Sequence, residues 1–153
     1  MSWKRLLGFA AACLFATGAS AGGSGSALLN HWYKGSTDST TLYVTNISDT
    51  TITFYVELYD QNGTLYNENT ETGDNINVVG FSGDPTAGGG TLQPKQTGKM
   101  GVRNLGDSRY GAGIIRWEAQ DDVRVAATAF AYRTYIPSDF SIFTIDINGG
   151  APF

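Results

Sequence analysis

The sequence predicts an all-β fold, an antiparallel sandwich of two sheets. Apolar and polar residues alternate with a period of two in several separate stretches, the pattern of strands that turn one face to a core and the other toward water. No stretch beyond the N-terminal region carries apolar residues at helical spacing with caps at both ends. About seven or eight strands are expected, and a closed barrel of similar strand number is the alternative architecture.

Each expected strand has an inward and an outward set of side chains. Between positions 52 and 59, for example, the apolar residues stand at even positions and the polar or aromatic residues at odd positions. The stretches with such alternation are 42–45, 52–59, 114–119, 123–132 and 143–147.

Turn-forming residues separate these strands. Asn46-Ile47-Ser48-Asp49 is expected to close a hairpin between the first two of them, and Asp60-Gln61-Asn62-Gly63 offers the left-handed conformations that a tight hairpin requires. Gln120-Asp121-Asp122 joins two later strands, and Pro137-Ser138-Asp139 precedes the last one.

One segment departs from this regular spacing. Residues 67–91 are mostly polar and rich in glycine, so they predict one long loop. Structureless loops longer than about 12–15 residues are uncommon in compact domains and are usually functional or disordered. Ile76-Asn77-Val78-Val79 within this segment is expected to form a short additional strand.

The N-terminal residues have the form of a cleavable signal peptide. Lys4 and Arg5 precede an uncharged apolar run, and Ala19-Ser20-Ala21 supplies the small residues that signal peptidase accepts. The apolar run is about 13 residues long, short of the roughly 20 that cross a bilayer, which disfavours a membrane anchor. A lipid-modified Cys13 is the other alternative. We therefore expect an exported protein, delivered to the periplasm, the cell surface or the medium.

The expected domain organisation follows from this leader. Residues 1–21 form the signal peptide, 22–26 a flexible Gly/Ser tether and 27–153 one sandwich domain. Cleavage removes the only cysteine and leaves eight basic against 14 acidic residues, a net charge of −6. This charge argues against nucleic acid and anionic membrane surfaces as partners, and we expect no stable membrane insertion.

The residue types that catalysis requires are scarce. His31 is the sole histidine, there is no G-x-S-x-G turn, and the mature chain has no cysteine. Asp60, Asn62 and Thr64 have a spacing seen in calcium loops, but Leu65 stands where that loop needs glycine, so a hairpin explains them better. We expect no enzyme activity, no metal and no cofactor.

Aromatic residues give the strongest binding signal. Tyr55 and Tyr59 flank Glu57 on the strand face that opposes the expected core, and Tyr43 is expected on the equivalent face of the preceding strand. Exposed tyrosines suit sugar stacking or a protein interface, because they combine a large apolar area with few rotatable bonds. The alternative is that this face is the inside, or that a second sheet or the long loop covers it.

Two segments of the chain resemble bacterial exported immunoglobulin-like domains. The first runs from Asn46-Ile47-Ser48-Asp49 to Leu58-Tyr59-Asp60-Gln61-Asn62-Gly63, and the second is Leu92-Gln93-Pro94-Lys95-Gln96-Thr97. The resemblance covers about residues 40–104, and this chain has Lys95 where the family usually has glycine. It implies an immunoglobulin-like sandwich that serves adhesion, assembly or recognition rather than chemistry.

These observations predict a non-enzymatic interaction or adhesion module that works outside the cytoplasm, with a protein or a glycan as its partner. A second hypothesis is a self-assembling fibre or surface-layer subunit, a homo-oligomer in which residues 27–33 pair with the sheet edge of a neighbour. A carbohydrate-binding module is the third hypothesis, and it requires an open tyrosine surface.

Overall fold

The structure, a computed structural model, describes residues 22–35, 38–66, 76–102, 108–123, 126–135, 141–145 and 147–153. The expected signal peptide lies outside these residues. The described strands are β1 (Ser24–Lys34), β2 (Asp38–Asn46), β3 (Ile52–Asp60), β4 (Leu65–Tyr66), β5 (Ile76–Val79), β6 (Ser82–Asp84), β7 (Gly89–Leu92), β8 (Thr97–Val102), β9 (Arg109–Glu118), β10 (Ala127–Tyr135) and β11 (Ser141–Ile145), followed by a 3-10 turn, η1 (Asn148–Gly150).

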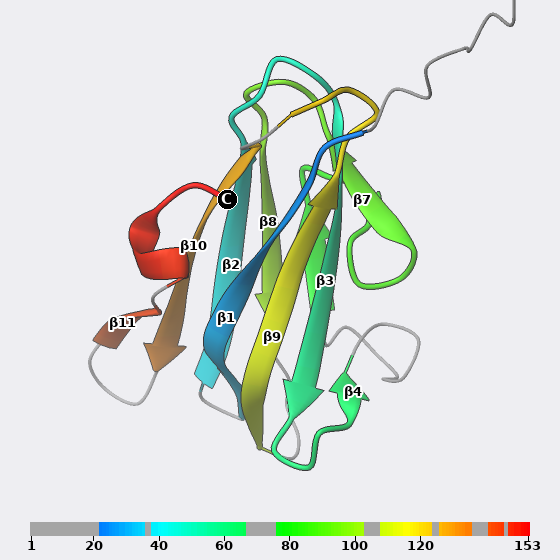
Figure 1. The fold of residues 1–153 in the computed structure, drawn as a ribbon. Helices are drawn as coiled ribbons and strands as arrows, with labels where there is room; N and C mark the ends of the chain where they lie inside the picture. The colour runs from blue at the N-terminus through cyan, green and yellow to red at the C-terminus, as the bar shows by residue number, and fades with distance from the viewer. Residues whose placement is uncertain are drawn as a thin grey trace, which may run out of the picture.

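The strands form two sheets that pack face to face, which confirms the all-β sandwich (Figure 1). Sheet A has the order β1-β9-β3-β7-β6, with β4 also paired to β3, and sheet B has the order β11-β10-β2-β8-β5. All strand pairs are antiparallel. β1, β9 and β3 cover one side of the molecule in Figure 1, and β2, β8 and β10 lie behind them.

The described sandwich has more strands than the alternation indicated, because short strands occupy much of the segment predicted to be a loop. Within 67–91, β5 extends sheet B by pairing with β8, and the β6–β7 hairpin extends sheet A by pairing with β3. The short strand expected at 76–79 is therefore confirmed, whereas a loop is wrong for residues 82–84 and 89–91. Glycine-rich strands of three or four residues carry too little alternation to be recognised.

The expected hairpin between β2 and β3 is wrong. β2 pairs with β8 and β10, whereas β3 pairs with β4, β7 and β9, so residues 47–51 lead the chain from sheet B to sheet A. Alternation shows which side chains of a strand share a face, but it does not show which strand lies beside it. β2 and β3 have the same alternation whether they pair in one sheet or face each other across the core.

The expected tether over residues 22–26 is also wrong. Ser24, Gly25 and Ser26 belong to β1 and pair with β9, and the main chain of Gly23 bonds to Ala119 and Asp121. Composition suggested flexibility, but glycine is needed here for packing: a Cβ on Gly25 would lie 2.4 Å from Nε1 of Trp117. The folded domain therefore starts about three residues earlier than expected.

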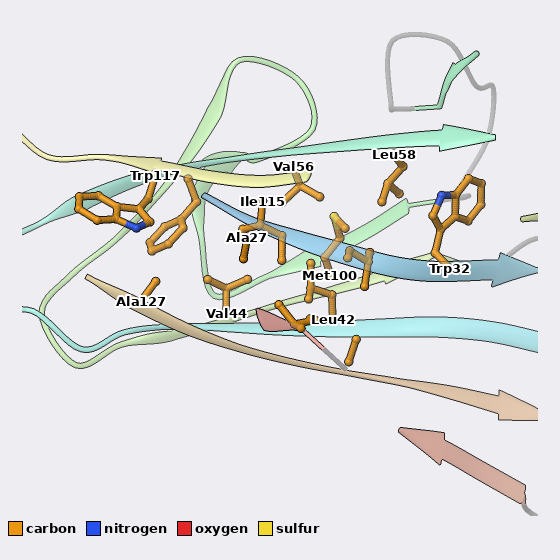
Figure 2. Packing of buried hydrophobic residues seen from close by; sticks show 14 of the residues in the cluster. Ala27, Trp32, Leu42, Val44, Val56, Leu58, Met100, Ile115, Trp117 and Ala127 are labelled. Atoms are coloured by element: carbon orange, nitrogen blue, oxygen red, sulfur yellow. The ribbon is translucent and has the colours of Figure 1, made fainter. Parts of the chain in front are cut away.

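The core lies between the two sheets, with a tryptophan near each end (Figure 2). Val56 and Ile115 of sheet A face Leu42 and Val44 of sheet B, and all four are at most 2% exposed. Trp32 is fully buried, and its indole N–H donates to the carbonyl oxygens of Tyr59 and Ala112 at 3.0 and 3.1 Å. Both sheets thus contribute their inward residues to one interior.

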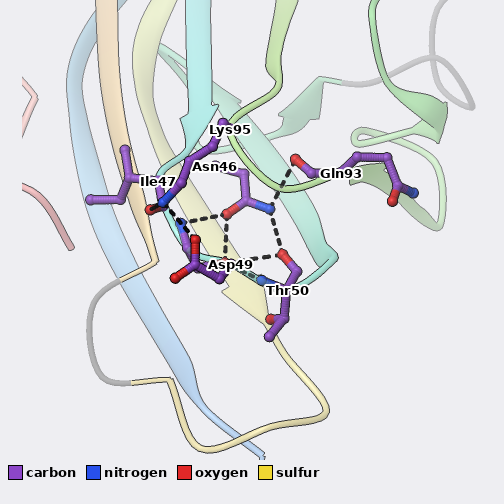
Figure 3. Close-up of polar contacts among 7 residues, drawn as sticks. Asn46, Ile47, Asp49, Thr50, Gln93 and Lys95 are labelled. Carbon is purple, nitrogen blue, oxygen red and sulfur yellow. Dashed lines mark hydrogen bonds and ion pairs between the residues drawn. The ribbon is translucent and has the colours of Figure 1, made fainter.

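Asn46, at the end of β2, holds the sheet-to-sheet connection together (Figure 3). Its buried amide Nδ2 donates to the carbonyl oxygens of Thr50, Leu92 and Gln93, at 2.8, 3.1 and 3.2 Å. Its Oδ1 accepts from the main-chain N–H and the hydroxyl of Ser48. One side chain therefore ties the β2–β3 connection to the start of the β7–β8 turn.

Lys95 reinforces this junction from the β7–β8 turn. Its φ of 62° places it in the left-handed region, which explains why glycine suits this position. Its Nζ donates to the carbonyl oxygen of Ile47 at 2.6 Å and forms an exposed ion pair with Asp49 at 3.0 Å. The two segments that carry the family resemblance are thus in direct contact.

The C-terminal residues close the end of the core that holds Trp117, beside the Asn46 junction. The main-chain oxygen of Phe153 accepts from the N–H groups of Ala126 and Ala127 and from the indole N–H of Trp117, at 3.1, 2.9 and 2.9 Å. Its N–H donates to the carbonyl oxygen of Ala127 at 2.8 Å. We call residues 147–153 the C-terminal clasp, because this single oxygen joins β9 of sheet A to β10 of sheet B.

The contact between Gly25 and Trp117 predicts that Gly25→Ala lowers the free energy of unfolding by about 1–3 kcal/mol, the usual cost of overpacking a dense core. Ser26→Ala, on the exposed face of the same strand, is the control and should change it by less than about 0.5 kcal/mol. Urea denaturation measures both. Equal stabilities of the two variants would mean that residues 24–26 are a tether after all.

Removal of the Asn46 amide should leave several polar groups without partners. We expect Asn46→Ala to lower the free energy of unfolding by about 2–4 kcal/mol, since an unsatisfied buried group costs about 1–3 kcal/mol. Gln93→Ala removes an exposed side chain beside it and is the matched control. A loss for Asn46→Ala no larger than that of Gln93→Ala would contradict the role given to this amide.

Candidate interaction face

The outward residues of β3 lie where the alternation placed them. Phe54, Val56 and Leu58 are at most 2% exposed, whereas Tyr55, Glu57 and Tyr59 point away from the core and are partly exposed. The sheet order puts sheet B on the opposite side of β3, so the alternative that this face is the inside of the sandwich is wrong.

Tyr43 does not share this face. It lies on β2, in register with Lys99 of β8 and Phe130 of β10, and is therefore on the outer side of sheet B. The sequence prediction that grouped Tyr43 with Tyr55 and Tyr59 failed because it assumed that β2 and β3 are neighbours. The sandwich separates them by its full thickness.

Instead, β1 and β9 complete the surface. Tyr33 of β1 pairs in register with Tyr110 of β9, and Leu28 pairs with Ile114. Leu28 is 53% exposed and Tyr110 49% exposed, although both are large and apolar in part. We call this outer surface of sheet A the tyrosine face; it consists of Leu28, Tyr33, Tyr55, Glu57, Tyr59, Tyr110, Ile114 and Arg116.

Three of the four tyrosines on this face lie on the three adjacent strands β1, β9 and β3. Tyr33 and Tyr110 are direct neighbours, and Tyr59 lies opposite Ala112, two residues further along β9. Strands are about 4.8 Å apart and residues about 3.4 Å apart along a strand, so the Cα atoms of Tyr110 and Tyr59 are about 8 Å apart. Aromatic side chains from β1, β9 and β3 thus follow one another across the sheet.

Glu57 organises the centre of the tyrosine face. Its Oε2 accepts from the hydroxyl of Tyr59 at 2.8 Å, and its Oε1 forms an ion pair with Nη2 of Arg116. The hydrogen bond to Glu57, followed by desolvation and the negative charge of the same carboxylate, raises the pKa of Tyr59. Glu57 therefore fixes the orientation of two neighbouring side chains.

A glycine of β7 supports the position of Tyr55. Gly89 has a φ of 105°, and a Cβ added to it would lie 2.9 Å from Cε1 of Tyr55 and 2.9 Å from Cγ2 of Thr53. The ring of Tyr55 consequently packs directly onto the main chain of β7. The sequence showed a run of glycines here but gave no sign of which ring they accommodate.

The turn after β3 borders the face and is held by a carboxylate. Oδ1 of Asp60 accepts from the N–H groups of Asn62 and Thr64 at 2.8 and 2.9 Å, and these bonds lower the pKa of Asp60. Gly63 adopts a φ of 76°, as the tight turn requires. The spacing that resembled a calcium loop is therefore occupied by turn hydrogen bonds.

The described residues of the tyrosine face offer apolar area and hydrogen-bonding groups. Among the described residues, no cluster of three or more His, Cys, Asp or Glu side chains could hold a metal ion. His31, considered as a catalytic base, is exposed on β1. No helix in the described part of the chain is long and apolar enough to cross a bilayer.

Comparison of the chain with protein-family models, with curated proteins and with solved structures finds no match.

The Tyr59–Glu57 hydrogen bond predicts a pH effect. Because the folded-state pKa of Tyr59 is raised above its ordinary value of 10.0, the contribution of this hydrogen bond to stability is complete below pH 10.0 and is lost as the pH rises through the folded-state pKa. In Glu57→Gln, the Tyr59 pKa should move down toward 10.0. NMR titration of carbon-13-labelled tyrosine rings measures this, and a midpoint unaffected by Glu57→Gln would disprove the coupling.

Proposed function

We propose that this protein is a non-enzymatic interaction module that works outside the cytoplasm and binds its partner with the tyrosine face. Its location is inferred from residues 1–21, which have the charged start, apolar run and small-residue end of a signal peptide. The observation that carries the binding proposal is the concentration of four of the eight tyrosines on the outer side of one sheet.

The composition of this face supports a protein partner. Tyrosine and arginine are enriched in interface centres and among the residues that dominate binding energy, and here they surround the exposed Leu28 and the half-exposed Ile114. The charges of Glu57 and Arg116 already compensate each other. A partner could therefore cover this face without burying a lone charge.

The ordered side chains of the tyrosine face also support a role in binding. Tyr59 is held by a hydrogen bond to Glu57, and the ring of Tyr55 packs against the main chain of Gly89. Side chains that are already ordered lose less conformational entropy when a partner binds. The face is thus suited to recognition without rearrangement of the sheet.

A carbohydrate is the second candidate partner, favoured by Tyr33, Tyr110 and Tyr59 on three adjacent strands. Successive aromatic rings on a flat sheet can stack on the apolar faces of successive sugar rings, and Glu57 and Arg116 offer polar atoms to hydroxyl groups. Strand exchange has less support, because residues 27–33 are part of β1, which pairs with β9 of the same chain.

The double variant Tyr55→Ala/Tyr59→Ala tests the proposal. We expect it to weaken partner binding at least about tenfold, since the few central residues that dominate an interface, often tyrosines, cost about 2 kcal/mol or more each when truncated. Binding is measured by affinity capture from the envelope and medium of the native producer with quantitative mass spectrometry, and in parallel on a glycan array. The best matched control is Tyr43→Ala, a half-exposed tyrosine on the opposite face of the sandwich.

Unfolding midpoints of all variants confirm that the sandwich is intact. The proposal is wrong if ligands captured by the parent protein bind the double variant unchanged, or if Tyr43→Ala weakens binding as much as the double variant does. If the parent protein binds glycans and captures no protein, the partner of the tyrosine face is the second candidate, a carbohydrate.

A further inference from the structure

The C-terminal clasp contains a turn with unusual backbone geometry. Three successive residues of η1 have positive φ: 50° at Asn148, 60° at Gly149 and 76° at Gly150. Asn tolerates this left-handed region better than most residues that carry a side chain, which explains its place in the turn. The turn lies between two buried anchors, Ile147, which bridges to Leu29 of β1, and Phe153.

The side chain of Asn148 holds this turn to the rest of the clasp. Its Nδ2 donates to the carbonyl oxygens of Ala151 and Pro152, at 3.1 and 3.2 Å. These bonds direct the chain toward Phe153, whose main-chain oxygen accepts from Trp117 and from β10. The amide group of Asn148 is therefore part of the link between the turn and the core.

An asparagine followed by glycine is chemically reactive, because the main-chain nitrogen of the glycine can attack the asparagine side chain without steric hindrance from a Cβ. The chain has two such pairs, Asn62-Gly63 and Asn148-Gly149, both in exposed turns. The main-chain nitrogen atoms of the two glycines differ in their hydrogen bonds. Gly63 donates its N–H to the carbonyl oxygen of Asp60 at 2.9 Å, whereas Gly149 has no acceptor among the described residues.

We infer that Asn148 is a site of spontaneous covalent modification, at which the protein converts its own amide into a carboxylate or an isoaspartate. The nitrogen of Gly149 bonds to Cγ of Asn148, the Cγ–Nδ2 bond breaks, and ammonia leaves with the proton of the Gly149 N–H. Water then opens the resulting succinimide ring. Attack at Cγ gives aspartate, and attack at the main-chain carbonyl carbon gives isoaspartate; no oxidant or reductant is consumed.

The modification would loosen the clasp. The two N–H donors of Asn148 are lost, and a carboxylate faces the carbonyl oxygens of Ala151 and Pro152 instead. Isoaspartate also lengthens the main chain by one carbon atom between the anchors Ile147 and Phe153. The oxygen of Phe153 then moves relative to the indole of Trp117. As the modified fraction grows with time, the contact that joins the two sheets changes.

Ageing of the purified full chain at mildly alkaline pH tests this inference. Peptide mapping by mass spectrometry measures conversion at both sites, with isoaspartate identified by its separate elution. We expect Asn148 to convert about fivefold faster than Asn62, the factor that corresponds to about 1 kcal/mol for the hydrogen bond that restrains Gly63. In denaturing urea, which removes this bond, the two rates should become equal.

Asn148→Asp provides a direct test of the consequence, because it introduces the modified charge with little change in size. We expect the indole N–H resonance of Trp117 to shift in this variant and in the aged protein, whereas Asn62→Asp should leave it in place. Equal conversion of the two asparagines in the folded chain would overturn the site assignment. An unchanged Trp117 resonance in Asn148→Asp would overturn the link to the clasp.

Discussion

The arrangement of this sandwich depends on the buried amide of Asn46. The chain must pass from sheet B to sheet A at residues 47–51, and a connection of this kind presents main-chain carbonyl groups to the interior, where each needs a donor. The Asn46 side chain supplies donors to Thr50, Leu92 and Gln93. It thereby fixes where β3 begins and how the end of β7 meets it.

The tyrosine face is a consequence of that placement. Once β3 pairs with β9 in sheet A, burial of Phe54, Val56 and Leu58 turns the intervening Tyr55, Glu57 and Tyr59 outward. The same rule turns Ile114 and Arg116 of β9 to the same side. Core packing and surface chemistry are therefore coupled, because the period of a strand leaves no freedom to change one face without the other.

The two ends of the core are closed by different means, and both use a tryptophan. Trp32 bonds to main-chain oxygens of its own sheet, whereas Trp117 bonds to the oxygen of Phe153, which also accepts from β10. The second arrangement depends on a short turn with left-handed residues, and such turns concentrate backbone strain. The clasp is accordingly the place where the inferred change at Asn148 would affect the link between the two sheets.

The sequence by itself determined the class of fold, the strand positions in the longer alternating stretches, the outward direction of Tyr55, Glu57 and Tyr59, and the hairpin turn after Asp60. These features depend on interactions between residues close in the chain, which alternation and turn chemistry express directly.

Only the tertiary structure decided which strands are neighbours. It separated Tyr43 from Tyr55, brought Tyr33 and Tyr110 beside Tyr59, and made residues 24–26 part of a strand. The physical reason is that a strand meets the same requirement, one face toward a dry interior, in either sheet. The choice between the sheets is made by contacts distant in sequence, such as Asn46 with Leu92 and Gly25 with Trp117.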